Sequence, residues 1–117
     1  MTIDADTLFR MLADPTRLRM IMLLIADGEL CVCELTHALG LSQPKISRHL
    51  AHLRETHLLA SRRAGQWMYY RIHPELPDWA LRILQQTLDG NRGTRPFVDD
   101  HRALTGMPDR PGTPCCA

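Results

Sequence analysis

Apolar residues recur along this chain with two different periods, and the change of period predicts the order of its secondary structure. Through the first half of the chain, and again near residue 80, they follow the three- and four-residue spacing of one helix face. Between these regions they alternate with polar residues, as in half-buried strands. The predicted helices cover residues 5–13, 14–27, 34–39, 42–55 and 78–89. The predicted strands cover residues 59–63 and 67–72.

The two helices in the middle of the chain are separated by a short glycine turn, as in a helix-turn-helix. Gly40 lies in this turn, and Ser42 is a suitable N-cap for the longer second helix. One side of that helix is apolar, while Arg48 and His52 lie on the opposite side. Residues 64–66 form a short loop between the two strands, which predicts a hairpin wing. The predicted fold is mainly α with a β-hairpin, a winged helix-turn-helix of four helices, two strands and a last helix.

The positive charge of the chain is concentrated in the segment that holds these elements. The 117 residues have a net charge of +1. Residues 42–73 contain six lysines or arginines and one glutamate, a net +5, so the remaining residues carry −4. A basic segment in an otherwise acidic protein is typical of a surface that faces phosphate, although a solvated helix face has the same composition. The charge pattern therefore favours nucleic acid as a partner.

Short polar and basic side chains near the start of the second helix are suited to read bases in the major groove. Gln can pair with adenine through two hydrogen bonds, and Ser, Lys and Arg can bond to base edges or phosphates. The wing adds two arginines beside this helix. The predicted contacts to double-stranded DNA are Ser42, Gln43, Lys45, Ser47, Arg48 and His52 on the helix and Arg62, Arg63 and Gln66 on the wing.

The chain is expected to form one domain at residues 1–89 for DNA binding and dimerisation, followed by a flexible tail at residues 90–117. Half of the eight prolines and four of the seven glycines lie in these last twenty-eight residues, a composition that disfavours packed structure. The helix predicted at 78–89 is too apolar for an exposed terminal helix. We therefore expect it to pair, together with the first helix, across the interface of a homodimer.

No segment of the sequence predicts export or membrane insertion. The longest apolar run, residues 20–26, is far shorter than the ~20 residues that cross a bilayer. Acidic residues stand near the N-terminus, where a signal peptide carries positive charge. We therefore expect a cytoplasmic protein with no membrane partner.

The four cysteines lie as Cys31-x-Cys33 and as the vicinal pair Cys115-Cys116. This spacing is poorly suited to disulfides that brace a fold, so reduced thiols are the simpler interpretation. Thiolates prefer soft ions. Cys31 and Cys33 would point about 200° apart on a helix, so they can share one ion only where the backbone is extended or begins to coil. The alternatives are a pair of small buried side chains at 31 and 33 and a tail pair that is inert or binds metal independently.

Four separated runs of residues carry a family resemblance. They are Leu12-Ala13-Asp14-Pro15-Thr16-Arg17-Leu18, Glu29-Leu30-Cys31-Val32-Cys33-Glu34-Leu35, Ser42-Gln43-Pro44-Lys45-Ile46-Ser47-Arg48-His49-Leu50 and Gly65-Gln66-Trp67-Met68-Tyr69-Tyr70-Arg71. In this order they resemble the arsenic-repressor (ArsR/SmtB) family of bacterial metal-sensing repressors, over roughly residues 7 to 88. The resemblance implies a homodimeric repressor that leaves its operator DNA when an inducer binds.

The resemblance also implies the inducer and its ligands. Arsenite sensors of this family carry a Cys-x-Cys pair at the start of the short helix, often with a third cysteine three residues later. The inducer implied is As(III) or Sb(III), with no organic cofactor. The third position is Thr36 here, which departs from the pattern, so a third sulfur has to come from the tail of the same chain or of the partner. The predicted inducer-binding residues are Cys31, Cys33, Cys115 and Cys116.

Two other functions use the same cysteines. A repressor that senses oxidation through a disulfide would respond to peroxide. A thiol-dependent arsenate reductase would use a cysteine nucleophile. The chain lacks a glycine-rich anion loop, and no cysteine is expected at a helix N-terminus within a basic cradle. The sequence therefore predicts a DNA-binding regulator and no enzyme.

Overall fold

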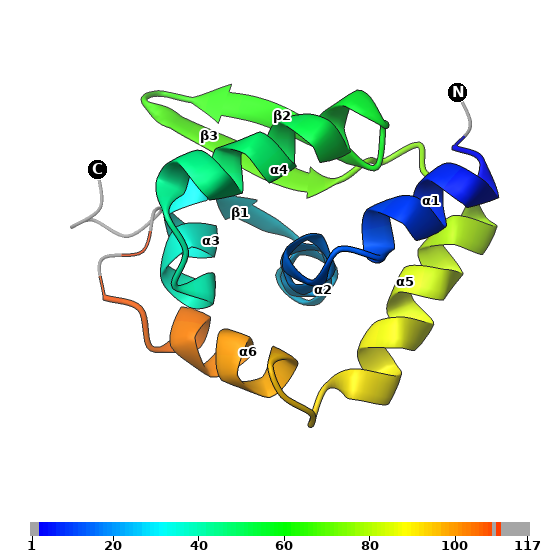
Figure 1. The fold of residues 1–117 in the computed structure, drawn as a ribbon. Coiled ribbons are helices and arrows are strands. Elements are labelled where there is room, and N and C mark those ends of the chain that lie inside the picture. The colour runs from blue at the N-terminus through cyan, green and yellow to red at the C-terminus, as the bar shows by residue number, and fades with distance from the viewer. Residues whose placement is uncertain (1–2, 109, 111–117) are drawn as a thin grey trace.

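The structure, a computed structural model, describes residues 3–108 and residue 110. The helices in this part of the chain are α1 (Ala5–Leu12), α2 (Pro15–Asp27), α3 (Val32–Leu39), α4 (Gln43–Glu55), α5 (Asp78–Asn91) and α6 (Phe97–Thr105) (Figure 1). The strands are β1 (Glu29–Cys31), β2 (Leu59–Ala64) and β3 (Trp67–Ile72). None of the described helices has both the length and the apolar character needed to cross a bilayer.

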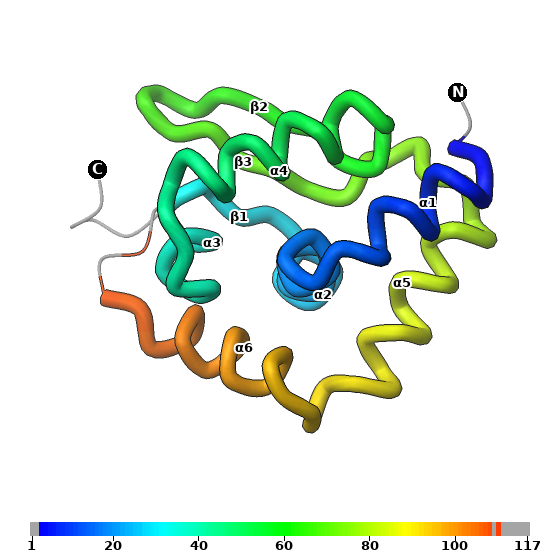
Figure 2. Tube along the Cα trace, in the orientation of Figure 1, coloured from blue at the N-terminus to red at the C-terminus, as the bar shows by residue number. Residues whose placement is uncertain are grey.

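Helix α2 forms the centre of the molecule. Figures 1 and 2 show α4 and the β2–β3 hairpin above it, α1 and α5 on one side, and α3 and α6 on the other. Five consecutive residues of α2, from Met20 to Leu24, are buried. A helix enclosed by its neighbours is apolar around most of its circumference, so these residues form the core on which the other elements pack.

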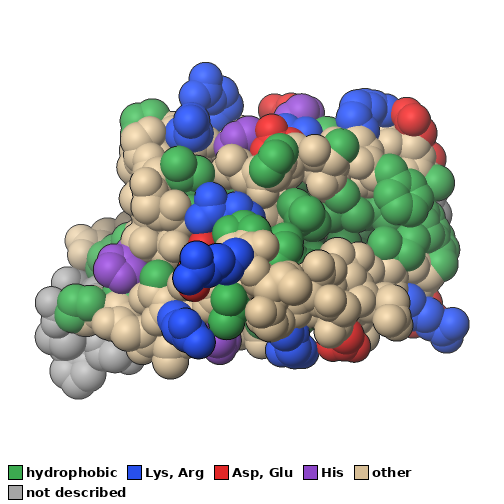
Figure 3. All heavy atoms as spheres, turned by 60° about the horizontal axis from the view of Figure 1, so that its bottom comes forward, with side chains coloured by type: hydrophobic (Ala, Val, Ile, Leu, Met, Phe, Trp, Pro, Cys, Tyr) green, Lys and Arg blue, Asp and Glu red, His purple; other side chains and the backbone are tan. Residues whose placement is uncertain are grey.

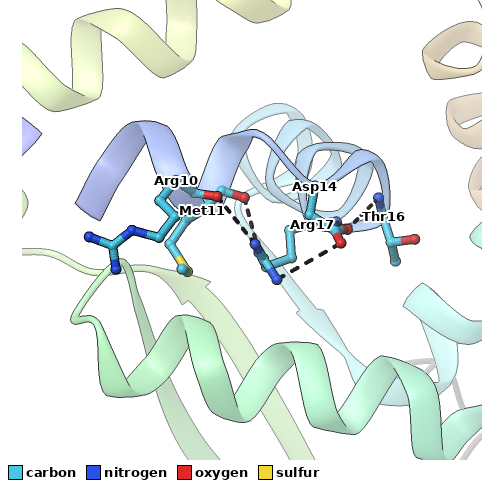
Figure 4. Close-up of polar contacts among 5 residues, drawn as sticks. All are labelled: Arg10, Met11, Asp14, Thr16 and Arg17. Carbon is cyan, nitrogen blue, oxygen red and sulfur yellow. Dashed lines mark hydrogen bonds and ion pairs between the residues drawn. The ribbon is translucent and has the colours of Figure 1, made fainter. Parts of the chain in front are cut away.

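Asp14 and Arg17 set the junction between α1 and α2 (Figure 4). Asp14 is the N-cap of α2, and its Oδ1 accepts hydrogen bonds from the backbone N–H groups of Thr16 at 2.8 Å and Arg17 at 3.0 Å. The Arg17 side chain donates to the carbonyls of Met11 at 3.0 Å and Arg10 at 3.2 Å. One residue pair therefore satisfies polar groups at the end of one helix and the start of the next.

The helix-turn-helix forms where the sequence predicts it. Helix α3 ends at Gly40, whose φ of 68° lies in the left-handed region that glycine adopts without strain. Ser42 is the N-cap of α4. The apolar face of α4 is fully buried through Ile46, Leu50 and Leu53. The predicted winged helix-turn-helix is thus confirmed.

The wing belongs to a three-stranded antiparallel sheet with the order β1-β3-β2. Strand β1, which the sequence analysis did not predict, pairs with β3 so that Glu29 lies opposite Arg71 and Cys31 opposite Tyr69. Three residues are too few to show an alternating pattern. The hairpin loop contains Gly65 at a φ of 63°, as its expected turn requires.

The segment predicted as a flexible tail contains the helix α6, so the expectation of a tail without structure is wrong for residues 97–105. Leu104 is buried, and Asp100 forms an ion pair with Arg19 of α2. The proline and glycine content suggested disorder. The residue that stabilises α6 through Asp100 is Arg19, eighty-one positions earlier in the chain, so the sequence around α6 does not reveal this ion pair. The division at residue 89 into a domain and a tail stays an interpretation, and Cys115 and Cys116 lie outside the described residues.

Candidate nucleic-acid interface and thiol site

Helix α4 and the β2–β3 hairpin pack together and form one surface of the molecule (Figure 1). Of the nine side chains predicted to contact DNA, Ser47 is half-buried and the others are exposed. The exposed ones are Ser42, Gln43, Lys45, Arg48, His52, Arg62, Arg63 and Gln66. The fold therefore presents all of them on two adjacent elements, the geometry that a groove-reading helix with a wing requires.

The first turns of α4 carry a hydrogen-bonded pair of polar side chains. Gln43 Nε2 donates to Ser47 Oγ at 2.7 Å, one helical turn further on. The bond holds the Gln43 amide along the helix face. Both groups are able to bond to base edges, and Gln43 would exchange this intramolecular bond for bonds to a base.

The wing arginine Arg62 is held by an acidic residue of β1. Arg62 donates from Nη2 to Glu29 Oε1 at 2.6 Å and from Nε to Oε2 at 2.8 Å. Its guanidinium also lies over the Tyr69 ring, 4.8 Å from the centroid. The hydrogen bonds from Arg62 lower the pKa of Glu29, although partial burial opposes the shift. Arg62 was predicted to contact DNA, and in this structure its side chain is bound to Glu29 of the strand that leads to Cys31.

Cys31 and Cys33 lie at the junction of β1 and α3, where the backbone changes from extended to helical. Cys31 is the last residue of β1 and the N-cap of α3, with φ −90° and ψ 168°. Cys33 follows in the first turn, and both cysteines are free thiols that influence each other's electrostatics. The backbone condition expected for two thiols that share one ion is therefore met. Cys31 is buried and Cys33 is half-buried, so solvent reaches the pair from the side of Cys33.

The environment of Cys31 keeps its thiol protonated. Burial raises the pKa of Cys31 to about 12, and the hydrogen bond with Cys33 adds to this effect. The backbone N–H of Glu34 opposes it. Cys31 lies at the start of the short helix, as the resemblance implies, and its pKa is raised rather than lowered. Such a thiol is unsuited to act as a nucleophile at neutral pH.

Glu34 is a buried acid beside the thiol pair that the sequence analysis did not identify. Its side chain is 4% exposed. Glu34 Oε1 accepts a hydrogen bond from the Cys31 backbone N–H at 2.9 Å, and Oε2 accepts one from Arg110 Nε at 2.7 Å. A glutamate three residues after an N-cap is the signal of a capping box. Here the N-cap is a cysteine and not the usual serine or threonine, so the sequence motif of a capping box was not recognisable.

The residues near the thiol pair provide two sulfur ligands. Within the described ranges, 3–108 and 110, no group of three or more His, Cys, Asp or Glu side chains is placed to hold a metal ion. Two adjacent thiols match a soft, sulfur-seeking centre, so these donors fit part of a three-sulfur site. The predicted ligands Cys115 and Cys116 fall outside the described part of the chain.

Comparison with known proteins identifies the family. Residues 14–61 match the family model described as bacterial regulatory protein, arsR family. The chain is 54% identical over 110 residues to the arsenic resistance transcriptional regulator ArsR1 of Pseudomonas putida, which covers 93% of this chain and 84% of that protein. It is 56% identical over 79 residues to the arsenical resistance operon repressor of Escherichia coli, 68% of each chain.

Several solved structures have the same fold. The AntR antimony-specific transcriptional repressor is 34% identical with a TM-score of 0.62, over 72% of this chain and 73% of that one. HlyU from Vibrio cholerae is 30% identical with a TM-score of 0.64, over 71% of this chain and 86% of that one. The chain therefore belongs to the ArsR family of bacterial transcriptional regulators and is not an enzyme.

Proposed function

We propose that this chain is a metalloid-responsive transcriptional repressor. It binds operator DNA as a cytoplasmic homodimer through α4 and the β2–β3 hairpin. Binding of As(III) or Sb(III) to Cys31, Cys33 and a third, C-terminal thiol releases it. The observation that carries the sensing half of this proposal is the position of two free thiols, Cys31 and Cys33, where the backbone changes from β1 to α3.

The DNA-binding half is supported by the chemistry of the α4 and hairpin surface. Gln43 and Ser47 provide neutral groups for base edges near the N-terminal end of α4, and Lys45 and Arg48 provide positive charge for phosphates. Arg63 adds charge on the wing. The single protomer presents one such surface, so a homodimer would read two half-sites about one helical turn apart.

The homodimer is supported by apolar side chains that one protomer leaves exposed. Phe9 of α1 is 53% exposed and Trp79 of α5 is 43% exposed. Figure 3 shows hydrophobic side chains gathered on the right of the view, the side on which α1 and α5 lie in Figure 1. Large exposed aromatic residues are typical of association surfaces. The α1 and α5 face is therefore the proposed dimer interface.

The thiol pair fits a metalloid hydroxide particularly well. Arsenous acid, As(OH)3, binds thiols by condensation: each As–S bond that forms replaces an As–O bond, and the thiol proton leaves with the hydroxide as water. No oxidation or reduction takes place. A protonated thiol such as Cys31 therefore binds arsenite without release of a free proton, whereas a divalent cation must displace the proton.

Two connections link the thiol pair to the DNA-binding surface. Cys31 pairs with Tyr69 of β3, so β1 is hydrogen-bonded to the hairpin. Helix α3, which starts at Cys31, ends at the Gly40 turn that leads into α4. A change of backbone geometry at Cys31 would thus shift the wing and the reading helix, and a coupling of ~1–3 kcal/mol gives about 5- to 150-fold weaker DNA binding.

The test replaces both thiols and follows release from a labelled operator by fluorescence anisotropy. The Cys31→Ser/Cys33→Ser double variant should bind the operator with unchanged affinity and no longer respond to arsenite. Thiol and hydroxyl have similar shape, so the fold should be kept, and Thr36→Ser on the same helix is the matched control that should respond as the wild type does. If arsenite still releases the double variant from the operator, the sensing mechanism is overturned.

A parallel titration with peroxide distinguishes a metalloid sensor from a redox sensor, because a redox sensor would leave the operator on addition of peroxide in the absence of arsenite.

A further inference from the structure

A cavity lies between the central helix α2 and the two helices that follow the wing, α5 and α6. Figures 1 and 2 show α4 and α6 on opposite sides of α2, so the cavity is away from the DNA-binding surface. It is open to solvent, and its volume is about 250 Å³. At ~30 Å³ for each molecule of liquid water, this is room for about eight waters. A molecule with one ring or a short chain therefore fits the cavity, whereas a helix does not.

The walls of the cavity are mostly apolar. Helix α2 contributes Met22 and Leu23, α5 contributes Leu88, and α6 contributes Phe97 and Val98. An apolar molecule that enters removes these walls from water, which favours binding. We therefore expect an occupant with an apolar body.

The charged side chains in the lining are mainly positive. Arg19, Arg92 and Arg102 line the cavity together with one acid, Asp100, so the lining has a net charge of +2. Both carboxylate oxygens of Asp100 accept hydrogen bonds from Arg19, at 2.8 and 2.7 Å, and this buried pair is neutral as a whole. Figure 3 brings the bottom of Figure 1 forward and shows Lys and Arg side chains on that face. The uncompensated charge of the cavity thus belongs to Arg92 and Arg102.

Both of these guanidinium groups are available to a ligand. Among the described residues, the Arg102 side chain has no ion pair or hydrogen bond. Arg92 contacts Asp89 at 3.5 Å, and both side chains of this pair are 62% exposed. An exposed pair of this kind contributes little to stability, so Arg92 can exchange it for another anion. The planar guanidinium group matches a carboxylate through two parallel hydrogen bonds.

We propose that this cavity binds a small organic anion with an apolar body, such as an aromatic or short-chain carboxylate. The apolar part lies against the walls formed by α2, α5 and α6, and the carboxylate lies on Arg92 and Arg102. None of the residues of the thiol pair or of the predicted DNA contacts lines this cavity. The site is therefore separate from the proposed function and adds a second ligand class to it.

The first experiment titrates the isotope-labelled, full-length protein with benzoate and follows its backbone amides by NMR. Benzamide has the same ring and shape without the charge, so it is the matched neutral probe. Benzoate should shift the amides of residues that line the cavity and should bind at least about tenfold more tightly than benzamide, because hydrogen bonds to charged groups are stronger than neutral ones. Equal affinities would overturn the proposal. Absence of benzoate binding, the result expected if a second copy of the chain covers the cavity, would also overturn it.

The second experiment removes one of the charges. Arg102→Gln changes an exposed residue of α6, so the fold should be kept. Its affinity for benzoate should fall at least about fivefold, because a charge-assisted hydrogen bond is lost, and its affinity for benzamide should not change. Arg54→Gln is the control, since it removes the same charge from an exposed position on α4. Equal benzoate affinities of the two variants would show that only the net charge of the protein matters.

The third experiment fills the cavity. Ala26 is an exposed residue of α2 in the lining, and Ala26→Trp would place a large side chain at this position. The variant should lose binding of both benzoate and benzamide, with a circular dichroism spectrum like that of the wild type. A folded variant that binds both probes with wild-type affinity would place the site elsewhere and overturn the assignment. The Arg102→Gln comparison tests the proposal independently of whether the tryptophan variant folds.

Discussion

Cys31 lies directly opposite Tyr69 in the antiparallel register of β1 and β3. The Tyr69 ring lies beneath the guanidinium of Arg62, which forms two hydrogen bonds with Glu29 at the other end of β1. The strand that ends in a proposed metalloid ligand is thus tied to the wing through both its backbone and a side chain. We expect ligand binding at Cys31 to change the position of Arg62.

Glu29 should restrain the wing arginine. In Glu29→Gln the charge that holds Arg62 is removed, so Arg62 should become available to a phosphate. We expect tighter operator binding and a salt dependence steeper by about 0.9 in the slope of log K against log salt, the value for one added phosphate contact. Binding is measured by anisotropy from low to high salt, with Glu75→Gln as an exposed control outside the sheet. An unchanged slope would mean that Arg62 does not face the DNA.

Gln43 should contribute to sequence recognition. We expect Gln43→Ala to weaken binding to the specific operator by about 1–3 kcal/mol, because a bidentate contact to a base is lost. Binding to unrelated DNA should not change. Lys45→Ala is the comparison: a phosphate contact should weaken binding to both DNAs and lower the salt slope by about 0.9. Equal losses on both DNAs for Gln43→Ala would contradict a role in base reading.

Asp14 should stabilise the α1–α2 junction in a pH-dependent manner. Burial raises the pKa of Asp14, but hydrogen bonds from Arg17 and Thr16 and the Arg17 charge outweigh it, so the pKa lies below the ordinary 3.8. A group whose pKa is lower in the folded state than in the unfolded state stabilises the protein at any pH above its unfolded-state pKa. This stabilisation is lost as the pH falls through the lower pKa of the folded state.

The measurement for Asp14 is urea unfolding at neutral and acidic pH. Asp14→Ala should lower the free energy of unfolding at neutral pH by about 1 kcal/mol, the usual cost of a lost N-cap. Asp14→Asn keeps a cap acceptor, so it should lower the free energy of unfolding by less than Asp14→Ala does. It should also remove the part of the pH dependence of stability that comes from the Asp14 charge. An Asn variant with the full pH dependence of the wild type would refute this assignment.

Asp100 should hold α6 in place. Its side chain is 4% exposed and that of Arg19 is 23% exposed. Removal of one partner of a fully buried pair costs ~3–5 kcal/mol, and the partial exposure of Arg19 reduces our estimate for Asp100→Ala to about 2–3 kcal/mol. Urea unfolding measures this loss of stability, and faster tryptic cleavage within α6 reports the release of α6 from the core.

The control is Asp99→Ala, which changes the exposed neighbour of Asp100 and should lower the free energy of unfolding by less than about 1 kcal/mol. Similar effects of the two variants would show that the buried pair is unimportant.

Phe9 and Trp79 should belong to the dimer interface. A charge introduced at Trp79 would lie within an apolar contact, so Trp79→Glu should shift the protein towards monomers and weaken operator binding in parallel. Sedimentation at micromolar concentration measures the mass, and His37→Glu on α3 is the control at an exposed site away from α1 and α5. Wild-type protein that sediments as a monomer would rule out the proposed homodimer.

The parts of this structure that follow from local rules were predictable from residue order. Asp14 before Pro15 marks the start of a helix, and Gly40 marks the end of another, because caps and turns depend on neighbours within a few residues. The apolar spacing along α4 predicted its buried face through Ile46, Leu50 and Leu53. The Cys31-x-Cys33 spacing likewise indicated that two thiols meet only if the helix starts there.

Other parts depended on partners that are distant in the chain. Glu34 meets Arg110 seventy-six positions later, and Arg19 meets Asp100 eighty-one positions later. In α6 the apolar stripe is interrupted by Asp100, which is polar by sequence and buried in the fold. Local sequence therefore determined helices α1 to α5, the turn after α3 and the identity of the thiol pair. Only tertiary packing decided that the C-terminal segment folds back onto α3, because ion pairs between remote residues become favourable only when burial brings their charges together.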